Sequence, residues 1–129
     1  MPDGIKVEVK GIADLARTFR KAGNEGARDL LLEANREAAA RVARTARALA
    51  PSRTGRLAGS IRSAGSVKGG IVRAGSAKIQ WAGPIHFGWF RRNIKPNPFI
   101  FKAMDVEAAK VHEIYMDRLD QLLETVKGA

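Results

Sequence analysis

The chain has 129 residues, the length of one domain with a modest core, and we expect a single domain over residues 1–129. Its hydrophobic fraction of 45% excludes disorder along the whole chain. It contains no cysteine, which excludes disulfides and thiolate metal sites, and no apolar run long enough to cross a membrane. The net charge of +10 favours an acidic partner, either nucleic acid or an acidic protein surface.

The positive charge is concentrated in the middle of the chain. Residues 1–37 carry seven basic and seven acidic side chains, and residues 105–129 carry three basic and six acidic ones. Residues 38–104 carry thirteen basic side chains and no Asp or Glu. Because a solvated surface normally mixes both signs, we expect this acid-free segment to face something negative. One candidate is the acidic C-terminal segment, in the same chain or in a neighbouring copy.

The first predicted elements are a strand and a short helix. Ile5, Val7 and Val9 alternate with charged residues, which predicts a half-buried strand. Apolar residues at helical spacing over residues 12–19 predict a short helix that ends at Gly23.

A long helix is predicted from about residue 25 to residue 50, with Pro51 ending it. Only Glu37 is placed to pair with one of its arginines, Arg41, so a binding role and a merely solvated role for the arginine face both stay open. The predicted apolar face contains Leu31, Ala34, Ala38, Val42, Ala46 and Leu49, and the opposite face contains Arg36, Arg41, Arg44 and Arg47.

The region from residue 50 to residue 87 is predicted to hold a basic loop and a small antiparallel sheet. Residues 50–57 have the composition of a loop, and a strand is expected to begin at residues 60–62. Gly69-Gly70 predicts a two-residue hairpin turn. A further strand is predicted over residues 79–87, where Pro84 would make it an edge or bulged strand.

Residues 88–98 are predicted to form an exposed loop. They contain two aromatic residues, Trp89 and Phe90, and three positive charges. Loops often carry function, although these aromatic rings could instead cover the edge of the core.

The C-terminal helix is predicted from Pro98 to about residue 126. The first turns of this helix place one face of residues together: Phe99, Ala103, Val106 and Lys110. This face lies about 160° around the helix from the apolar stripe of the last turns. Either the helix breaks near His112, or its last turns pack on something other than the core. The later stripe has the spacing of a coiled-coil seam. We therefore expect residues 113–129 to pack on a neighbouring subunit through Tyr115, Leu119, Leu122 and Val126.

No pattern in the sequence indicates catalysis, a metal site or a cofactor. His86 and His112 match no metal-ligand spacing, and the middle of the chain has no carboxylates to form an acid–base pair. The phosphate-binding loop and the nucleophile-elbow motif are both absent. One enzymatic alternative, a basic ribonuclease that uses His86 or Tyr115, is supported by charge alone.

Three runs of residues resemble phage tail-completion proteins, the head–tail joining (neck or connector) proteins of long-tailed phages (siphoviruses), including the minor tail protein Z type. Ala50-Pro51-Ser52-Arg53-Thr54-Gly55-Arg56-Leu57 with Ser60-Ile61 resembles the family's Ala-Pro-x-x-Thr-Gly-x-Leu-x-x-Ser-Ile run. Trp81-Ala82-Gly83-Pro84-Ile85-His86-Phe87-Gly88 is similar to its Tyr-Ala … Glu/His-Phe-Gly run, with Trp81 in place of the usual Tyr. Pro98-Phe99-Ile100 with Ala103 is similar to its Pro-Phe-hydrophobic-x-x-Ala run, and the order and spacing agree over about residues 5–104.

This resemblance implies an α+β virion protein without catalysis: an N-terminal strand, a short helix, a long Ala/Arg-rich helix, a small antiparallel sheet and a C-terminal helix. Such proteins, assembled in the host cytoplasm, form a ring that we expect to contain six copies. The ring lies between the head-closure protein and the tail terminator or tail tube protein, with DNA passing through its lumen and no membrane involved. The basic residues on predicted loops are expected to contact DNA or an acidic neighbour: Arg53, Arg56, Arg91, Arg92 and Lys95.

The alternative is a free basic nucleic-acid-binding protein. Such a protein would bind DNA as an isolated monomer, with an affinity that falls steeply as salt is added.

Overall fold

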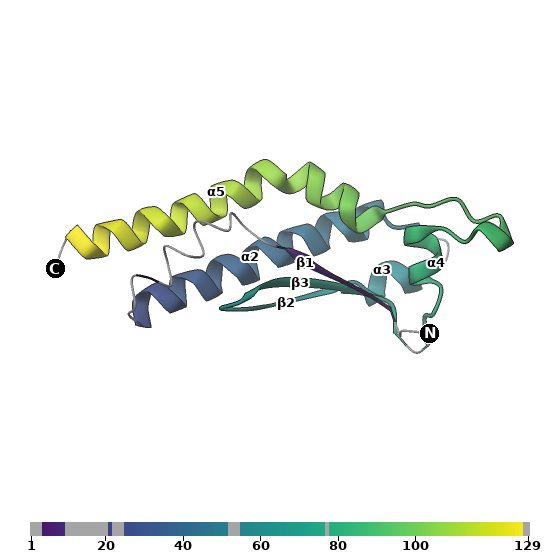
Figure 1. Cartoon of the computed structure of the whole chain (residues 1–129), viewed down its shortest axis with the longest axis horizontal. Helices are drawn as coiled ribbons and strands as arrows, with labels where there is room; N and C mark the ends of the chain where they lie inside the picture. Colours follow the sequence, from purple (N-terminus) through teal and green to yellow (C-terminus); the bar gives the residue numbers. More distant parts are fainter. Residues whose placement is uncertain (1–3, 10–20, 22–24, 52–54, 77, 128–129) are drawn as a thin grey trace.

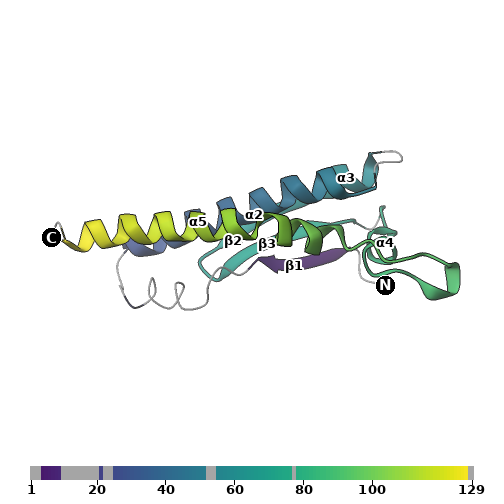
Figure 2. The ribbon, with the colours of Figure 1, turned by 90° about the horizontal axis from the view of Figure 1, so that it is seen from above.

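The structure is a computed structural model that describes residues 4–9, 21, 25–51, 55–76 and 78–127. It is a mixed α+β fold in which the long helix α2 contacts the sheet on one side and the C-terminal helix α5 on another (Figure 1). The two long helices run antiparallel along the length of the molecule (Figure 2). The described elements are β1 (Ile5–Val9), α2 (Glu25–Leu49), α3 (Arg56–Ser60), β2 (Arg62–Ser66), β3 (Gly69–Ala74), α4 (Ala82–Phe87), the 3-10 turn η1 (Phe90–Arg92) and α5 (Phe99–Lys127).

The predicted strand at residues 5–9 and the predicted long helix are confirmed as β1 and α2. The predicted short helix over residues 12–23 lies almost wholly outside the described residues. The buried face of α2 is wider than one stripe and consists mostly of alanine, because the helix packs against both the sheet and α5. Small side chains let both neighbours approach closely. Leu49, predicted on the apolar face, is 40% exposed, and Ala46 and Ala50 occupy the buried positions at this end.

The sheet is antiparallel, with the strand order β1-β3-β2. The predicted hairpin is present, but its turn is at Val67-Lys68, and Gly69-Gly70 belong to β3. Gly65 lies opposite Gly70 in this register. A Cβ atom on Gly65 would lie only 2.8 Å from the backbone nitrogen of Arg36, so the glycine allows β2 to approach α2.

The predicted strand over residues 79–87 is wrong. Only an isolated bridge pairs Ile79 with Ser76, and the short helix α4 follows. Pro84 lies in the first turn of α4, where a missing N–H costs little. The loop predicted at residues 50–57 is also wrong in its last part, because α3 begins at Arg56. Strand β2 begins at Arg62, within the range predicted for its start.

Helix α5 is continuous, so the predicted break near His112 is wrong. The predicted change of face is also wrong, because the buried stripe runs along α5 without interruption. Val106 is 66% exposed, and the inward position is taken by Glu107, a polar residue that interrupts the apolar pattern. The inward positions along the helix are Phe99, Ala103, Glu107, Val111, Tyr115, Arg118 and Leu122.

Polar side chains join the layers. The Tyr115 hydroxyl donates a hydrogen bond to Oδ1 of the buried Asn35, whose Nδ2 donates to the carbonyl oxygen of Ser66 at 2.6 Å. Asn35 therefore connects α2 with both α5 and β2. Glu107 accepts hydrogen bonds from Arg41 and Thr45 of α2, and these bonds hold the pKa of Glu107 below its ordinary value.

Candidate assembly and nucleic-acid surfaces

The first candidate surface is the aromatic loop, residues 88–98, at the end of the molecule opposite the C-terminus (Figure 1). Backbone hydrogen bonds of 2.9 and 3.0 Å join Trp89 and Ile94 in both directions, and Asn93 adopts the left-handed conformation between them. The backbone N–H of Asn97 donates a hydrogen bond of 2.8 Å to the carbonyl oxygen of Ile85, which fixes the last part of the loop against α4. The loop therefore has a defined shape.

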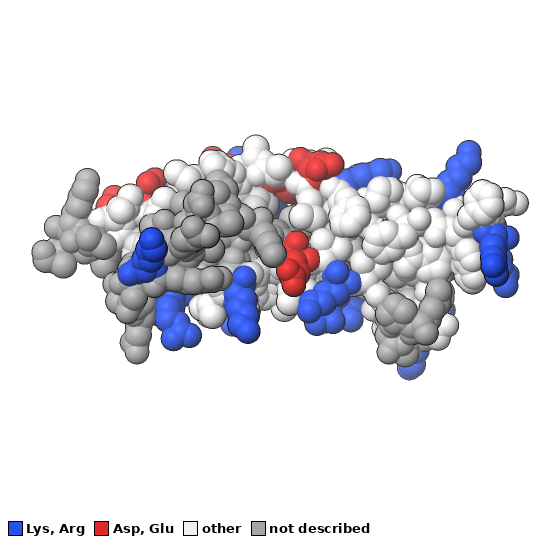
Figure 3. All heavy atoms as spheres, in the orientation of Figure 1, with Lys and Arg blue, Asp and Glu red and all other residues white. Residues whose placement is uncertain are grey.

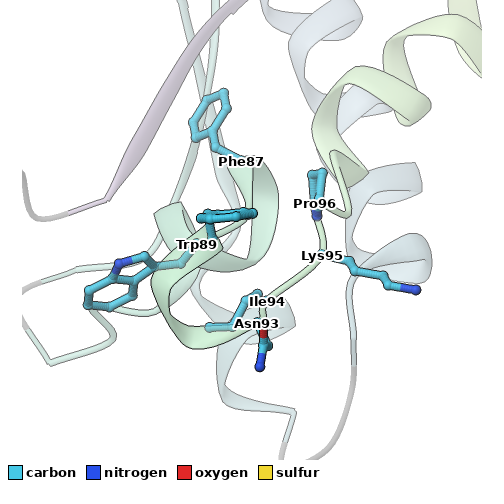
Figure 4. A pocket seen from close by; sticks show the side chains of 8 residues that line it. Phe87, Trp89, Asn93, Ile94, Lys95 and Pro96 are labelled. Carbon is cyan, nitrogen blue, oxygen red and sulfur yellow. The ribbon is translucent and has the colours of Figure 1, made fainter.

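The aromatic side chains of this loop do not cover the core. Phe90 is 96% exposed and Trp89 is 39% exposed, and neither belongs to the hydrophobic core. Phe87, which precedes the loop, is 59% exposed. The Arg92 guanidinium lies 5.3 Å from the centre of the Trp89 ring, at cation–π distance. An open hollow of about 450 Å³ is lined by residues 87–90 and 93–96, and Trp89 and Lys95 point away from each other around it (Figure 4).

His86 lies beneath the aromatic loop and is fully buried. Its ring makes edge contacts with Phe87, Phe99 and Phe101, at centroid distances of 4.5, 5.1 and 4.7 Å. Neither ring nitrogen has a hydrogen-bond partner among the described residues, and burial lowers the pKa of His86, which favours the neutral ring. Tyr115, the other residue of the ribonuclease alternative, is 2% exposed. Neither residue is placed to reach an RNA substrate.

The second candidate surface is a cationic row on the side of the sheet that faces away from α2. Lys6 of β1 lies opposite Arg73 of β3, and Arg73 lies opposite Arg62 of β2. All three side chains are exposed, and none forms an ion pair with a described carboxylate. Nη1 of Arg62 donates to the carbonyls of Ser60 and Gly75, which holds this guanidinium in place. Basic residues lie along the sheet side of the molecule and at the loop end (Figure 3).

The third candidate surface is the acidic face, the outward face of the C-terminal half of α5. Four carboxylates lie beside two apolar side chains there, and Met116 and Leu123 are 36% and 48% exposed. Counted from Glu113, the residues three, four, seven, ten and eleven positions further on fall on the same side of the helix, within an arc of about 120°. The acidic face consists of Glu113, Met116, Asp117, Asp120, Leu123 and Glu124.

The predicted basic site residues fall on different elements. Arg53 lies outside the described residues. Arg56 is the first residue of α3 and lies 5.5 Å from the ring of Trp81. Arg91 and Arg92 form part of η1, and Lys95 follows them in the same aromatic loop. The sequence pattern alone does not bring Lys6, Arg62 and Arg73 together, because their alignment depends on the register of the sheet.

The predicted inter-subunit seam on α5 is wrong for two of its residues. Tyr115 and Leu122 are each 2% exposed and pack inside the chain, which leaves no surface for a neighbour. Leu119 is half-buried against the same core, and the side chain of Val126 lies outside the described part of the structure. The acidic face holds most of the described exposed side chains in this half of α5.

Within the described residues, no cluster of three or more His, Asp or Glu side chains could hold a metal ion. No described helix is long and apolar enough to cross a membrane. The chain matches no curated protein and no solved structure.

A protein-family model described as "Bacteriophage HK97-gp10, putative tail-component" matches residues 13–83, more than half of the chain. The chain therefore belongs to this family of bacteriophage tail components, which agrees with the resemblance to phage tail and neck proteins. The matched span includes α2, α3 and the hairpin of β2 and β3.

Proposed function

We propose that this chain is a structural protein of the phage neck and tail, which completes the tail for attachment to the head and forms a ring around the DNA channel. The observation that carries the proposal is the match of residues 13–83 to a phage tail-component family. The ring would lie in the virion between the head-closure protein and the tail terminator or tail tube protein, after assembly in the host cytoplasm.

The cationic row is the surface that best fits DNA in such a ring. Adjacent strands lie about 4.8 Å apart, so Lys6, Arg73 and Arg62 hold three positive charges close together. Like charges directly opposite each other destabilise a sheet. DNA phosphates would offset that repulsion, and the hydrogen bonds that hold Arg62 reduce the entropy lost on binding.

The proposal is tested by deleting the gene in a phage that carries it and examining the lysate by electron microscopy. We expect separate filled heads and tails, with complete virions restored when the wild-type protein is supplied from a plasmid. Complete virions from the deletion phage would contradict the proposed role.

A second candidate function is a free nucleic-acid-binding protein, which the cationic row also favours. The two differ in what the isolated monomer does. A filter-binding measurement on the monomeric protein at low salt separates them, because a ring component should bind DNA weakly until copies assemble.

A further inference from the structure

The positive charges of the aromatic loop are not neutralised within the described part of the chain. The acid-free segment does meet the acidic C-terminal helix where Arg41 pairs with Glu107. Arg91, Arg92 and Lys95 form no ion pair with a described carboxylate. Phe90 projects its ring into solvent beside them. Exposed aromatic residues next to cations are the composition of an interaction surface.

The acidic face has the complementary composition. Asp117 pairs with Arg118, and Glu113 pairs with Lys110, so part of its charge is already used. The face holds four carboxylates, and only two described cations, Lys110 and Arg118, pair with them, so the face keeps a net negative charge. Met116 and Leu123 lie along one edge of the carboxylates and give an aromatic ring apolar surface to contact, with the methionine sulfur suited to an aromatic edge.

The two surfaces cannot meet within one chain. The aromatic loop precedes the first residue of α5, whereas the acidic face begins fourteen residues further on, at Glu113. At 1.5 Å per residue the acidic face lies roughly 20 to 40 Å along a rigid helix from the loop. The loop and the C-terminal half of α5 lie at opposite ends of the molecule (Figure 1).

We propose that the aromatic loop of one copy docks on the acidic face of a second copy of this chain. Trp89 and Phe90 contact Met116 and Leu123, and Arg91, Arg92 and Lys95 face the carboxylates of the partner. A contact between two different surfaces builds a ring or a longer array, or a closed pair if it is reciprocal. The inference rests on the self-assembly in the proposed function and assigns the surfaces that make it. Under this proposal the aromatic loop contacts protein, and the cationic row remains the surface that contacts DNA.

The experiment is a charge swap, measured by sedimentation velocity at low salt with the full chain. The loop variant carries Arg91→Glu, Arg92→Glu and Lys95→Glu, and the face variant carries Glu113→Lys, Asp120→Lys and Glu124→Lys. We expect the wild-type protein to self-associate and each variant alone to associate at least ten-fold more weakly. Mixing the two variants should restore assembly, because each reversed surface then meets its complement.

The control variant is Arg28→Glu, Lys68→Glu and Lys78→Glu, which changes the net charge as much as the loop variant does at exposed positions elsewhere. It should assemble like the wild type, and circular dichroism should report the same helix content for all variants.

Three results would overturn the contact: a wild-type chain that stays monomeric at low salt, a loop variant that assembles like the wild type, or a mixture that stays dissociated. A loop variant that assembles normally but loses DNA binding would assign the loop to nucleic acid instead. If the charge swap succeeds but a phage lacking the gene still joins heads to tails, the contact stands and the proposed function fails.

Discussion

Asn35 joins all three layers of the fold by hydrogen bonds. Its amide accepts from the Tyr115 hydroxyl and donates to the Ser66 carbonyl, and it is 3% exposed. Replacing it by alanine leaves both partners without this bond and opens a small cavity. We expect Asn35→Ala to lower the free energy of unfolding by about 2–4 kcal/mol in urea titrations. The exposed control Arg28→Ala should change it by less than about 0.5 kcal/mol, and an equally small effect of Asn35→Ala would contradict the bridge.

Glu107 makes the stability depend on pH. A hydrogen bond from Arg41, and to a smaller extent one from Thr45, holds the pKa of Glu107 below its ordinary value of 4.5. Its contribution is therefore fully present above pH 4.5 and is lost as the pH falls through the lowered pKa. Since Arg41 is 35% exposed, solvent weakens the pair, and we expect Glu107→Gln to cost about 1–2 kcal/mol at pH 7. This difference from the wild type should shrink below pH 4.5, and a difference that did not change with pH would be inconsistent with the pairing.

At the scale of elements, the packing of the sheet on α2 depends on Gly65. A Cβ atom there would meet the backbone and the Cγ atom of Arg36 at 2.8–2.9 Å, closer than non-bonded atoms approach. We expect Gly65→Ala to destabilise the protein by about 1–3 kcal/mol, measured as a lower urea midpoint. The matched control is Gly59→Ala in α3, where a Cβ atom would have nothing within 4 Å. Equal midpoints for the two variants would show that β2 does not approach α2 this closely.

The elements with a strong periodic pattern were predictable from the sequence. Strand β1 and helices α2 and α5 were predicted within about two residues of their bounds. The turn at Val67-Lys68 was missed because Gly69-Gly70 is the stronger turn signal, although Gly65 and Gly70 serve close packing and strand pairing instead. The sequence does not predict helix α4, because a proline in a short apolar run indicates an interrupted strand, whereas the first turn of a helix accepts a proline equally well.

The cationic row cannot be predicted when the register of the hairpin is wrong by even a few residues. With a turn at Gly69-Gly70, Arg73 would lie opposite Ser66 rather than Arg62. The observed register brings Arg62, Arg73 and Lys6 into line, from positions far apart in the sequence. Sequence patterns did identify the charged stretch and the exposed loop, but they did not place either on the fold, because that depends on how α2, α5 and the sheet pack.

At the scale of the whole molecule, the row should contribute to DNA binding by the assembled protein. We expect Lys6→Gln with Arg73→Gln to reduce the slope of log affinity against log salt by about 2, because each lost phosphate contact removes about one unit. The control is Arg28→Gln with Arg44→Gln, two exposed cations of α2. If both pairs of substitutions changed the slope equally, binding would follow net charge and not the row.

The most direct measurement of the central claim is electron microscopy of the full-length protein at low salt, with its mass measured by light scattering. If the chain is a ring-forming tail component, closed rings with a channel wide enough for duplex DNA should form and should dissociate as salt is raised. A protein that remains monomeric at every concentration and salt, or that forms aggregates without a channel, would contradict it.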